Sequence, residues 1–244
     1  MASDDALLAF DGVTAGYVSE IDILRDVSFR IRSGWITSII GSNGAGKSTI
    51  LRTVFGYANV RSGRILLADT DMTTDPVSRR IARGVSYVAQ GRCNFPMMSV
   101  VENLKVACFT LERKRIEGEI ERVLSIFPML RQKAKDMAGN LSGGQQQILE
   151  MAMALVLQPR LLLIDEPTLG LSPKFFDEVF AQLVEIKRSG VTVLMVEQNA
   201  ARALQISDWA LVFDLGRLFK EGPAQAILTD TEVKERYLGG HAEV

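Results

Sequence analysis

The chain has almost no excess charge, a single histidine and only two cysteines. Its 28 basic and 29 acidic side chains leave a formal net charge of -1. That balance argues against a general nucleic-acid binder, because such proteins usually carry a strong basic excess. The cysteines, Cys93 and Cys108, have neither the spacing nor the further partners of a metal site, so we expect two free thiols in a reducing compartment.

We also expect neither a membrane-spanning segment nor a signal peptide. No apolar run approaches the roughly 20 residues that a membrane helix needs. Residues 1–5 are acidic and lack the basic-then-apolar pattern of a signal peptide. The 244 residues are 47% hydrophobic, which is enough to bury a full core. We therefore expect a soluble globular chain whose contact with any membrane goes through a partner.

The strongest local pattern is the glycine-rich segment 41–49, which lies between an apolar run at 36–40 and residues 50–55, which suit a helix. It matches G-x-x-x-x-G-K-[ST] in a strand–loop–helix setting and predicts a phosphate-binding loop. A chance glycine-rich turn before a helix is the alternative. The segment consists of Gly41, Ser42, Asn43, Gly44, Ala45, Gly46, Lys47, Ser48 and Thr49.

The residue types of this loop suit an anionic ligand. Its glycines allow a tight bend that turns successive N–H groups toward an anion. The following helix begins with unpaired N–H groups and a partial positive charge of roughly half a unit. We expect Lys47 to reach the β- and γ-phosphates of a nucleotide and the Ser48 hydroxyl to hold Mg²⁺.

Three later apolar stretches, 85–89, 161–164 and 191–196, read as buried strands that lead directly into polar side chains. Ligands of open α/β sheets bind outside the carboxyl ends of the strands. We therefore expect these polar ends and the phosphate-binding loop to surround one nucleotide. The polar residues are Gln90, Asp165, Glu166 and Gln198.

Two of them, Asp165 and Glu166, are adjacent carboxylates at the end of one buried strand. Burying two such negative charges without a positively charged partner costs on the order of several kcal/mol of free energy, and Mg²⁺ would provide the partner. Asp165 fits the metal-holding carboxylate of a phosphate-loop ATPase. Glu166 is placed to polarise an attacking water.

Helical spacing replaces β-branched runs between residues 93 and 157. A capping box opens a helix at 99–102, and 112–127 form an amphipathic helix. Ser142 and Gln145 again have capping-box spacing, and the helix that they open leads into residues 146–157. They indicate an ordinary capped helix or, through two consecutive glycines, a second anion-binding helix end. We predict a helical subdomain at about 93–157, inserted into an α/β core at about 1–92 and 158–244.

Antiparallel strands are predicted toward both ends of the chain. Short alternating stretches at 7–10 and 27–31 are broken by glycines, including Gly12, which we interpret as tight turns. Between them lies Tyr17, either an ordinary loop residue or an aromatic face for adenine. A hairpin is predicted at 211–220.

Taken in order, these motifs resemble those of an ATP-binding cassette ATPase along essentially the full chain. The most specific combination is Leu-Ser-Gly-Gly-Gln at 141–145 followed by Asp-Glu-Pro at 165–167. The resemblance implies an α/β fold: a P-loop NTPase core of the RecA type with an antiparallel β subdomain and an inserted α-helical subdomain. It implies hydrolysis of ATP with Mg²⁺ as cofactor.

The resemblance also assigns roles to the matching positions. Tyr17 would stack on adenine, and Gln90 would sense Mg²⁺ and the γ-phosphate. Asp165 would hold Mg²⁺, Glu166 would be the catalytic base, and Gln198 would donate a hydrogen bond to the γ-phosphate. The residues that would contact the ATP of a second copy or paralogue, in a head-to-tail dimer, are Ser142, Gly143, Gly144 and Gln145.

A narrower resemblance rests on Gly91-Arg92 and on segments 168–173, 196–200 and 237–240. These are similar to the second ATPase subunit of importers for branched-chain amino acids, with close relatives serving urea and short amides. The resemblance implies a peripheral position on the cytoplasmic face of a bacterial inner membrane. The implied partners are two transmembrane permease subunits, a second ATPase subunit and, indirectly, an extracytoplasmic solute-binding protein.

Three apolar residues after Gln90 have two interpretations. Phe95, Met97 and Met98 are either ordinary core or, as in such ATPases, the groove that receives a permease helix. The chain departs from the wider family at Gln198, where that family has His, and at Ser172, where many members have Asp. A non-transport cassette and a small-molecule kinase are the alternative functions; the kinase shares only the phosphate-binding loop.

Overall fold

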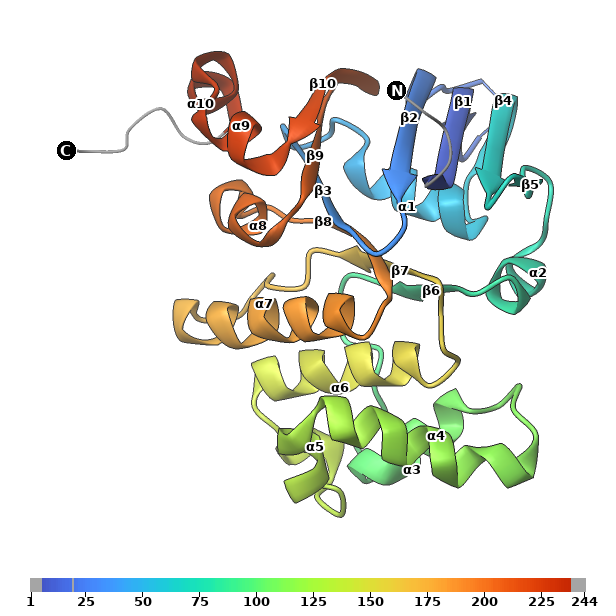
Figure 1. Ribbon diagram of the computed structural model, residues 1–244, viewed down its shortest axis with the longest axis vertical. Coiled ribbons are helices and arrows are strands. Elements are labelled where there is room, and N and C mark those ends of the chain that lie inside the picture. Colours follow the sequence, from blue (N-terminus) through green and yellow to red (C-terminus); the bar gives the residue numbers. More distant parts are fainter. Residues whose placement is uncertain (1–5, 19, 238–244) are drawn as a thin grey trace.

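The computed structural model describes residues 6–18 and 20–237, arranged as two sheets flanked by helices (Figure 1). The strands are β1 (Ala6–Gly16), β2 (Leu24–Arg32), β3 (Ile36–Gly41), β4 (Asn59–Leu67), β5 (Thr70–Asp71), β6 (Val85–Val88), β7 (Leu161–Asp165), β8 (Thr192–Val196), β9 (Trp209–Asp214) and β10 (Arg217–Pro223). The helices are α1 (Lys47–Phe55), α2 (Val77–Ala82), α3 (Val100–Ala107), α4 (Arg113–Ile126), α5 (Pro128–Gln132), the 3₁₀ turn η1 (Ala138–Asn140), α6 (Gly143–Leu155), α7 (Pro173–Arg188), α8 (Ala200–Ile206), α9 (Ala224–Thr229) and α10 (Thr231–Tyr237).

The larger sheet has the strand order β10-β9-β3-β8-β7-β6, and every neighbouring pair in it is parallel except β9 with β10. The smaller sheet has the order β2-β1-β4-β5 and is antiparallel. Parallel strands bring their carboxyl ends to one edge of a sheet, so the residues after β3, β6, β7 and β8 meet there. The expected α/β core with an antiparallel β subdomain is confirmed.

Strand β7 shows how the sequence divides the interior into two cores. All five of its residues are buried, because helices and strands cover both faces. Leu162 and Ile164 pack with the core that contains α6 and α7. Leu161 and Leu163 pack with the core that contains α1 and the smaller sheet. This alternation follows from the two-residue period of side chains along a strand.

The helices α3, α4, α5 and α6 gather at one end of the molecule, away from the smaller sheet (Figure 1). The described chain between β6 and β7 forms only helices, as the spacing predicted. Both predicted capping boxes are present: the side chain of Ser99 accepts from the backbone N–H of Glu102, and that of Ser142 accepts from the N–H of Gln145. The expected α-helical insertion is confirmed.

One local expectation was wrong. Gly12 does not end a strand: it lies within β1 at φ +60, where the pairing with β2 shifts register as in a β-bulge. The predicted hairpin is confirmed by the antiparallel pairing of β9 with β10, and β9 also pairs in parallel with β3 in the larger sheet. Helix α6 begins at Gly143, directly after its cap Ser142, so both glycines lie in its first turn.

A buried arginine fastens the carboxyl end of α1. Arg80 is 2% exposed, and its Nη1 donates to the carbonyls of Thr53 and Val54, both at 2.7 Å. Its Nε donates to the carbonyl of Asp75 at 2.8 Å. Helix ends leave carbonyls without intrahelical partners. Arg80 therefore satisfies the end of the helix whose beginning is the phosphate-binding loop.

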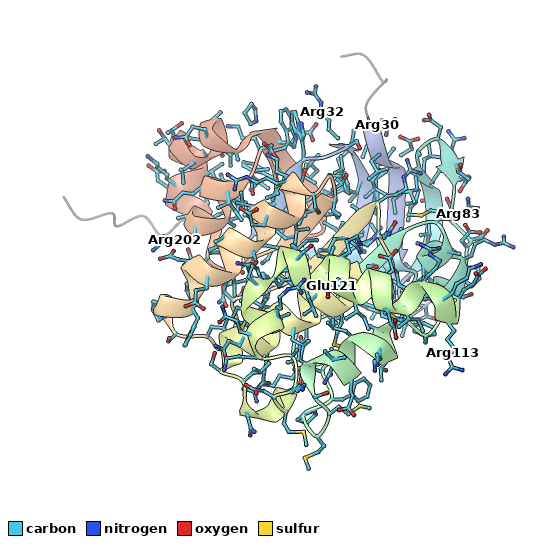
Figure 2. All side chains as sticks on the ribbon, turned by 60° about the horizontal axis from the view of Figure 1, so that its bottom comes forward. Arg30, Arg32, Arg83, Arg113, Glu121 and Arg202 are labelled. Atoms are coloured by element: carbon cyan, nitrogen blue, oxygen red, sulfur yellow. The ribbon has the colours of Figure 1, made fainter. Side chains whose placement is uncertain are left out.

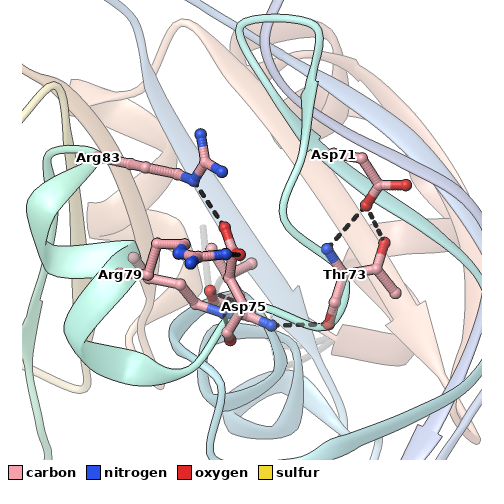
Figure 3. A network of polar contacts seen from close by, with 7 residues as sticks. Asp71, Thr73, Asp75, Arg79 and Arg83 are labelled. Atoms are coloured by element: carbon pink, nitrogen blue, oxygen red, sulfur yellow. Dashed lines mark hydrogen bonds and ion pairs between the residues drawn. The ribbon is translucent and has the colours of Figure 1, made fainter.

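The segment that carries Arg80 is braced by a polar network (Figure 3). Arg83 Nε lies 2.6 Å from Asp75 Oδ2, and Arg79 Nη1 lies 3.1 Å from Asp75 Oδ1. Burial alone would raise the pKa of Asp75, but the two guanidinium groups outweigh it and lower that pKa. Beside them, Asp71 accepts from the backbone N–H and the hydroxyl of Thr73.

Replacing Arg80 by methionine is expected to lower the free energy of unfolding by about 2–3 kcal/mol, because buried carbonyls lose a charged donor. Urea unfolding measures this loss. Arg79→Met is the matched control: its side chain is 64% exposed and makes one ion pair, so it should lose less than about 1 kcal/mol. Equal losses in the two variants would contradict the role given to Arg80.

Charged side chains occur on several elements of the described structure. The arginines labelled in Figure 2 come from β2, the end of α2, α4 and α8, and several are paired with carboxylates, as Arg30 is with Asp11 and Arg202 with Asp177. Within residues 6–18 and 20–237, no helix combines the length and the apolar character needed to span a membrane.

Candidate active site

The phosphate-binding loop joins β3 to α1, and close backbone contacts define its shape. A Cβ on Gly41 would lie 2.0 Å from the carbonyl oxygen of Phe213 in β9, so only glycine fits there. The backbone N–H of Gly216, in the β9–β10 turn, donates to the carbonyl of Ala45 at 3.1 Å. Because β9 pairs with β3, the same hairpin that completes the sheet also supports the loop.

Lys47 opens α1 and reaches back over the loop. It is 7% exposed, and its Nζ donates to the carbonyls of Gly41 at 2.9 Å and Ser42 at 2.8 Å. Burial lowers the pKa of Lys47, while the carboxylates of Glu166 and Asp165 act in the opposite direction. The loop thus presents a desolvated ammonium group beside backbone N–H groups, which is the chemistry that binds phosphate.

Asp165 and Ser48 are brought together across two elements. Ser48 Oγ donates to Asp165 Oδ1 at 2.8 Å, and Asp165 is 1% exposed at the end of β7. A hydroxyl beside a carboxylate is an oxygen donor set of the kind Mg²⁺ prefers. These residues therefore fit Mg²⁺, which would neutralise the charge of Asp165 and of the phosphates.

Tyr87 is a neighbour of this pair that the sequence did not indicate. Its hydroxyl donates to Asp165 Oδ2 at 3.0 Å. Burial, and then the charge of Asp165, raise the pKa of Tyr87, which keeps its hydroxyl a donor. The available signal was its position three residues before Gln90, in a strand that pairs with β7 in parallel.

Glu166 lies one residue beyond β7 in an unusual backbone conformation. Its φ is +49, a left-handed value that is uncommon for a residue with a side chain. Its backbone N–H donates to the carbonyl of Val196, and its Oε2 accepts from Gln90 Nε2 at 3.1 Å. Burial, followed by the charges of Asp165 and Glu197, raises the pKa of Glu166. A raised pKa strengthens a carboxylate as a base.

Glu197 is a second group whose role the sequence did not indicate. It is 2% exposed, and its Oε1 accepts from Thr168 Oγ1 at 2.8 Å and from the backbone N–H groups of Gln198 and Asn199 at 2.9 and 3.1 Å. It therefore ties the loop after Glu166 to the loop after β8. The signal was a carboxylate directly after a fully buried strand.

Three of the four polar strand-end residues, Gln90, Glu166 and Gln198, border one cleft of about 480 Å³ together with the phosphate-binding loop. Asp165 does not line this cleft, but it contacts Ser48, which does. None of residues 142–145 lines this cleft. Gly143 instead lines a neighbouring cleft of about 500 Å³, together with Gln90 and Glu166.

Tyr17 lies beside the phosphate cleft and does not line it. It is 38% exposed, and its hydroxyl donates to Thr49 Oγ1 and accepts from Arg52 Nη1, both at 3.4 Å. The hydrogen bond from Arg52 to Tyr17 is the largest of the effects that raise the pKa of that guanidinium. The ring is thus held at the amino end of α1 with one side in solvent.

The apolar residues after Gln90 settle one alternative. Phe95 is 44% exposed and Met97 is 84% exposed, so the core interpretation is wrong for both, while Met98 is half-buried. The two cysteines are free thiols as expected: Cys93 is exposed and Cys108 is buried. His241 and residues 238–240 of the narrower resemblance lie outside the described residues.

A phosphate-binding loop, an Mg²⁺ donor set and a basic carboxylate at one edge of a parallel sheet define a P-loop nucleoside triphosphatase. A family model described as ABC transporter matches residues 24–169, more than half of the chain. The chain belongs to this family and is one of its ATP-binding cassette ATPases.

Three curated relatives are similar over most of their length. The high-affinity branched-chain amino acid transport ATP-binding protein BraG of Pseudomonas aeruginosa is 38% identical, covering 96% of this chain and 100% of that protein. A probable branched-chain amino acid transport ATP-binding protein, LivF, of Archaeoglobus fulgidus is 40% identical, covering 93% and 96%. The lipopolysaccharide export system ATP-binding protein LptB of Escherichia coli K12 is 31% identical, covering 89% and 91%.

A solved structure shares the fold. The ADP conformation of MJ1267, an ATP-binding cassette of an ABC transporter, aligns with a TM-score of 0.86 at 27% identity, covering 96% of this chain and 99% of that one. The fold expected from the resemblance is therefore confirmed.

Proposed function

We propose that this ATPase powers an importer for branched-chain amino acids. The observation that carries the proposal is the identity of 38% and 40%, over nearly full length, to two relatives named for that transport, against 31% to an export subunit. Gln198 supports the same placement, because the resembled group of importer subunits shares glutamine there in place of histidine.

In the proposed mechanism, the backbone of the phosphate-binding loop and Lys47 hold the phosphates of ATP. Ser48, Asp165 and Gln90 would hold Mg²⁺, which would neutralise charge that develops on the phosphates. Glu166 removes a proton from the attacking water, and its raised pKa suits that task. In addition, Gln198 donates to the γ-phosphate and Tyr17 stacks on adenine.

We further propose that two ATP molecules are held between paired cassettes in a head-to-tail arrangement. Residues 142–145 lie outside their own phosphate cleft, which leaves them for the nucleotide of the second subunit. The N–H groups of the first turn of α6 would donate to its γ-phosphate. The helical subdomain, about 93–157, would carry this segment as a unit.

The proposed partners are two permease subunits on the cytoplasmic face of the membrane, a second ATPase and, outside, a solute-binding protein. Exposed Phe95 and Met97 form an apolar surface that suits contact with a permease helix. Purification from membranes with the associated subunits, followed by uptake of labelled leucine in proteoliposomes, tests the proposal. Leucine uptake that depends on ATP is expected; transport of urea or an amide but not of leucine would overturn it.

Because position 198 is glutamine where the wider family has histidine, we predict a pH profile of ATP hydrolysis without a histidine titration. An amide does not titrate, so hydrolysis should show no step near pH 6.5, the ordinary pKa of histidine. The measurement is kcat at pH values from about 5.5 to about 8.5, a range that spans this pKa. His241 is the only histidine, and His241→Gln is the control. An imidazole-like step that persists in this variant would contradict the proposed role of Gln198.

A further inference from the structure

The chain just after Gln90 is fastened to α6 by one buried carboxylate. Glu150 is 5% exposed, and its Oε1 accepts from the backbone N–H of Cys93 at 2.8 Å and of Asn94 at 3.3 Å. The side-chain Nδ2 of Asn94 donates to the same oxygen at 2.8 Å. One oxygen of α6 thus holds two consecutive residues of the loop.

The other oxygen of Glu150 makes this arrangement unusual. Among the described residues, Oε2 has no hydrogen-bond partner although it is buried. A buried acceptor without a donor destabilises a fold, so a half-satisfied carboxyl is a poor device for stability alone. Burial raises the pKa of Glu150, which points to the same poor solvation. Rules of local stability are most often broken where function requires it.

The loop next to Glu150 borders open space as well as protein. Glu150 lines two clefts, one of about 320 Å³ and the cleft of about 500 Å³ described above. Cys93 borders the first cleft, and Gly91 and Arg92 border the second. The hydrogen bonds to Glu150 therefore fix the loop at a place where it is partly open to solvent.

The next part of the loop is fastened to the helices as well. Asn103 of α3 is fully buried; its Oδ1 accepts from the N–H of Phe95 at 2.7 Å, and its Nδ2 donates to the carbonyls of Phe95 and Ser99. Between this fastened part and β6 lies Gly91, at φ +97 with open space around it. Gln90 thus lies between the larger sheet and a loop, residues 93–95, that is hydrogen-bonded to α6 and α3.

We propose that Glu150 is a positioning residue for Gln90: it makes the chain after Gln90 follow α6. Glu150 lies seven residues after Gly143, about 10 Å along the helix. A displacement of the first turn of α6 is then transmitted through Glu150 to Gln90, and from Gln90 to Glu166, which it contacts at 3.1 Å. This coupling rests on the proposed role of Gln90 in hydrolysis.

Two substitutions separate the hydrogen bonds of Glu150 from its charge. Glu150→Gln and Glu150→Met both remove the charge, but only glutamine keeps an acceptor oxygen. In the methionine variant the amides of residues 93 and 94 should exchange hydrogen about tenfold faster, as expected for the loss of one net hydrogen bond. In the glutamine variant they should exchange as in the native chain. Glu117→Met, on the exposed side of α4, is the control.

The rate of ATP hydrolysis by the assembled ATPase tests the positioning role, because a purely structural role of Glu150 would leave this rate unchanged. In Glu150→Met, kcat should fall about tenfold while KM for ATP stays within about twofold, because the phosphate-binding loop is untouched. Glu150→Gln should restore kcat. Asn94→Ala removes a donor from the loop side and leaves α6 intact, so it tests the same link if the methionine variant is unstable.

Two results would overturn the proposal. Native exchange rates at residues 93 and 94 in the methionine variant would show that Glu150 does not hold the loop. Faster exchange with unchanged kcat would show that the link does not position Gln90. Exchange needs no hydrolysis, so a failure of the proposed function, seen as an inactive native protein, is distinguishable from both.

Discussion

Replacing Glu166 by glutamine is expected to abolish turnover of ATP while leaving ATP bound. The glutamine side chain has the same size and still accepts a hydrogen bond from Gln90, but it cannot take a proton from water. Loss of a general base lowers rates by about 10²–10⁴-fold. We therefore expect kcat to fall by that factor and the affinity for Mg²⁺-ATP to stay within about threefold, since the phosphate-binding loop supplies the affinity.

Single-turnover hydrolysis and a binding titration on the same preparation measure the two quantities separately. Glu178→Gln is the matched control, because Glu178 is an exposed carboxylate on α7. Its turnover should equal that of the native protein. Native turnover in Glu166→Gln would remove Glu166 from the mechanism.

Replacing Lys47 by alanine is the second substitution with a large expected effect, and here binding is lost. A charged hydrogen bond contributes about 1.5–3 kcal/mol, and Lys47 is expected to contact two phosphates. The affinity for ATP should therefore fall by about 10² or more, since each 1.4 kcal/mol is about a factor of ten. Lys47→Arg should rescue little, because a planar guanidinium does not fit a site built for a compact ammonium.

The stability of this variant distinguishes loss of a ligand contact from loss of the fold. Burial lowers the pKa of Lys47 and so disfavours its charged form in the folded chain, whereas its hydrogen bonds to the carbonyls of Gly41 and Ser42 stabilise the loop. Because these two effects oppose each other, Lys47→Ala without nucleotide should change the free energy of unfolding by less than about 1 kcal/mol. Lys105→Ala, at an exposed position of α3, is the control for both assays. Earlier unfolding with unchanged affinity per folded molecule would contradict the role of Lys47.

Much of the fold could be predicted from the sequence because its signals are local. The apolar run before Gly41 and the glycines after it specify a strand, a turn and a helix without reference to distant residues. Ser99 and Ser142 predict the starts of their helices, because each forms a capping box with a residue only three positions later. The same holds for β7, whose unbroken apolar run predicts burial on both faces.

What the sequence did not predict depends on contacts between distant segments. The pairing of β9 with β3 gives Gly41 its close contact with Phe213, and nothing in either segment alone specifies the partner. Tyr87 and Glu197 are similar cases. Each reads as an ordinary residue of a strand or strand end, and its partner, Asp165 or Thr168, is distant in the chain. The bulge at Gly12 likewise follows from register with β2.

The most direct test is a structure of Glu166→Gln, together with its partner ATPase if one co-purifies, solved with Mg²⁺ and ATP. The account predicts a head-to-tail pair in which each γ-phosphate touches Lys47 of one subunit and the first turn of α6, residues 142–145, of the other. ATP seated on the phosphate-binding loop with residues 142–145 facing solvent in every assembly would contradict it.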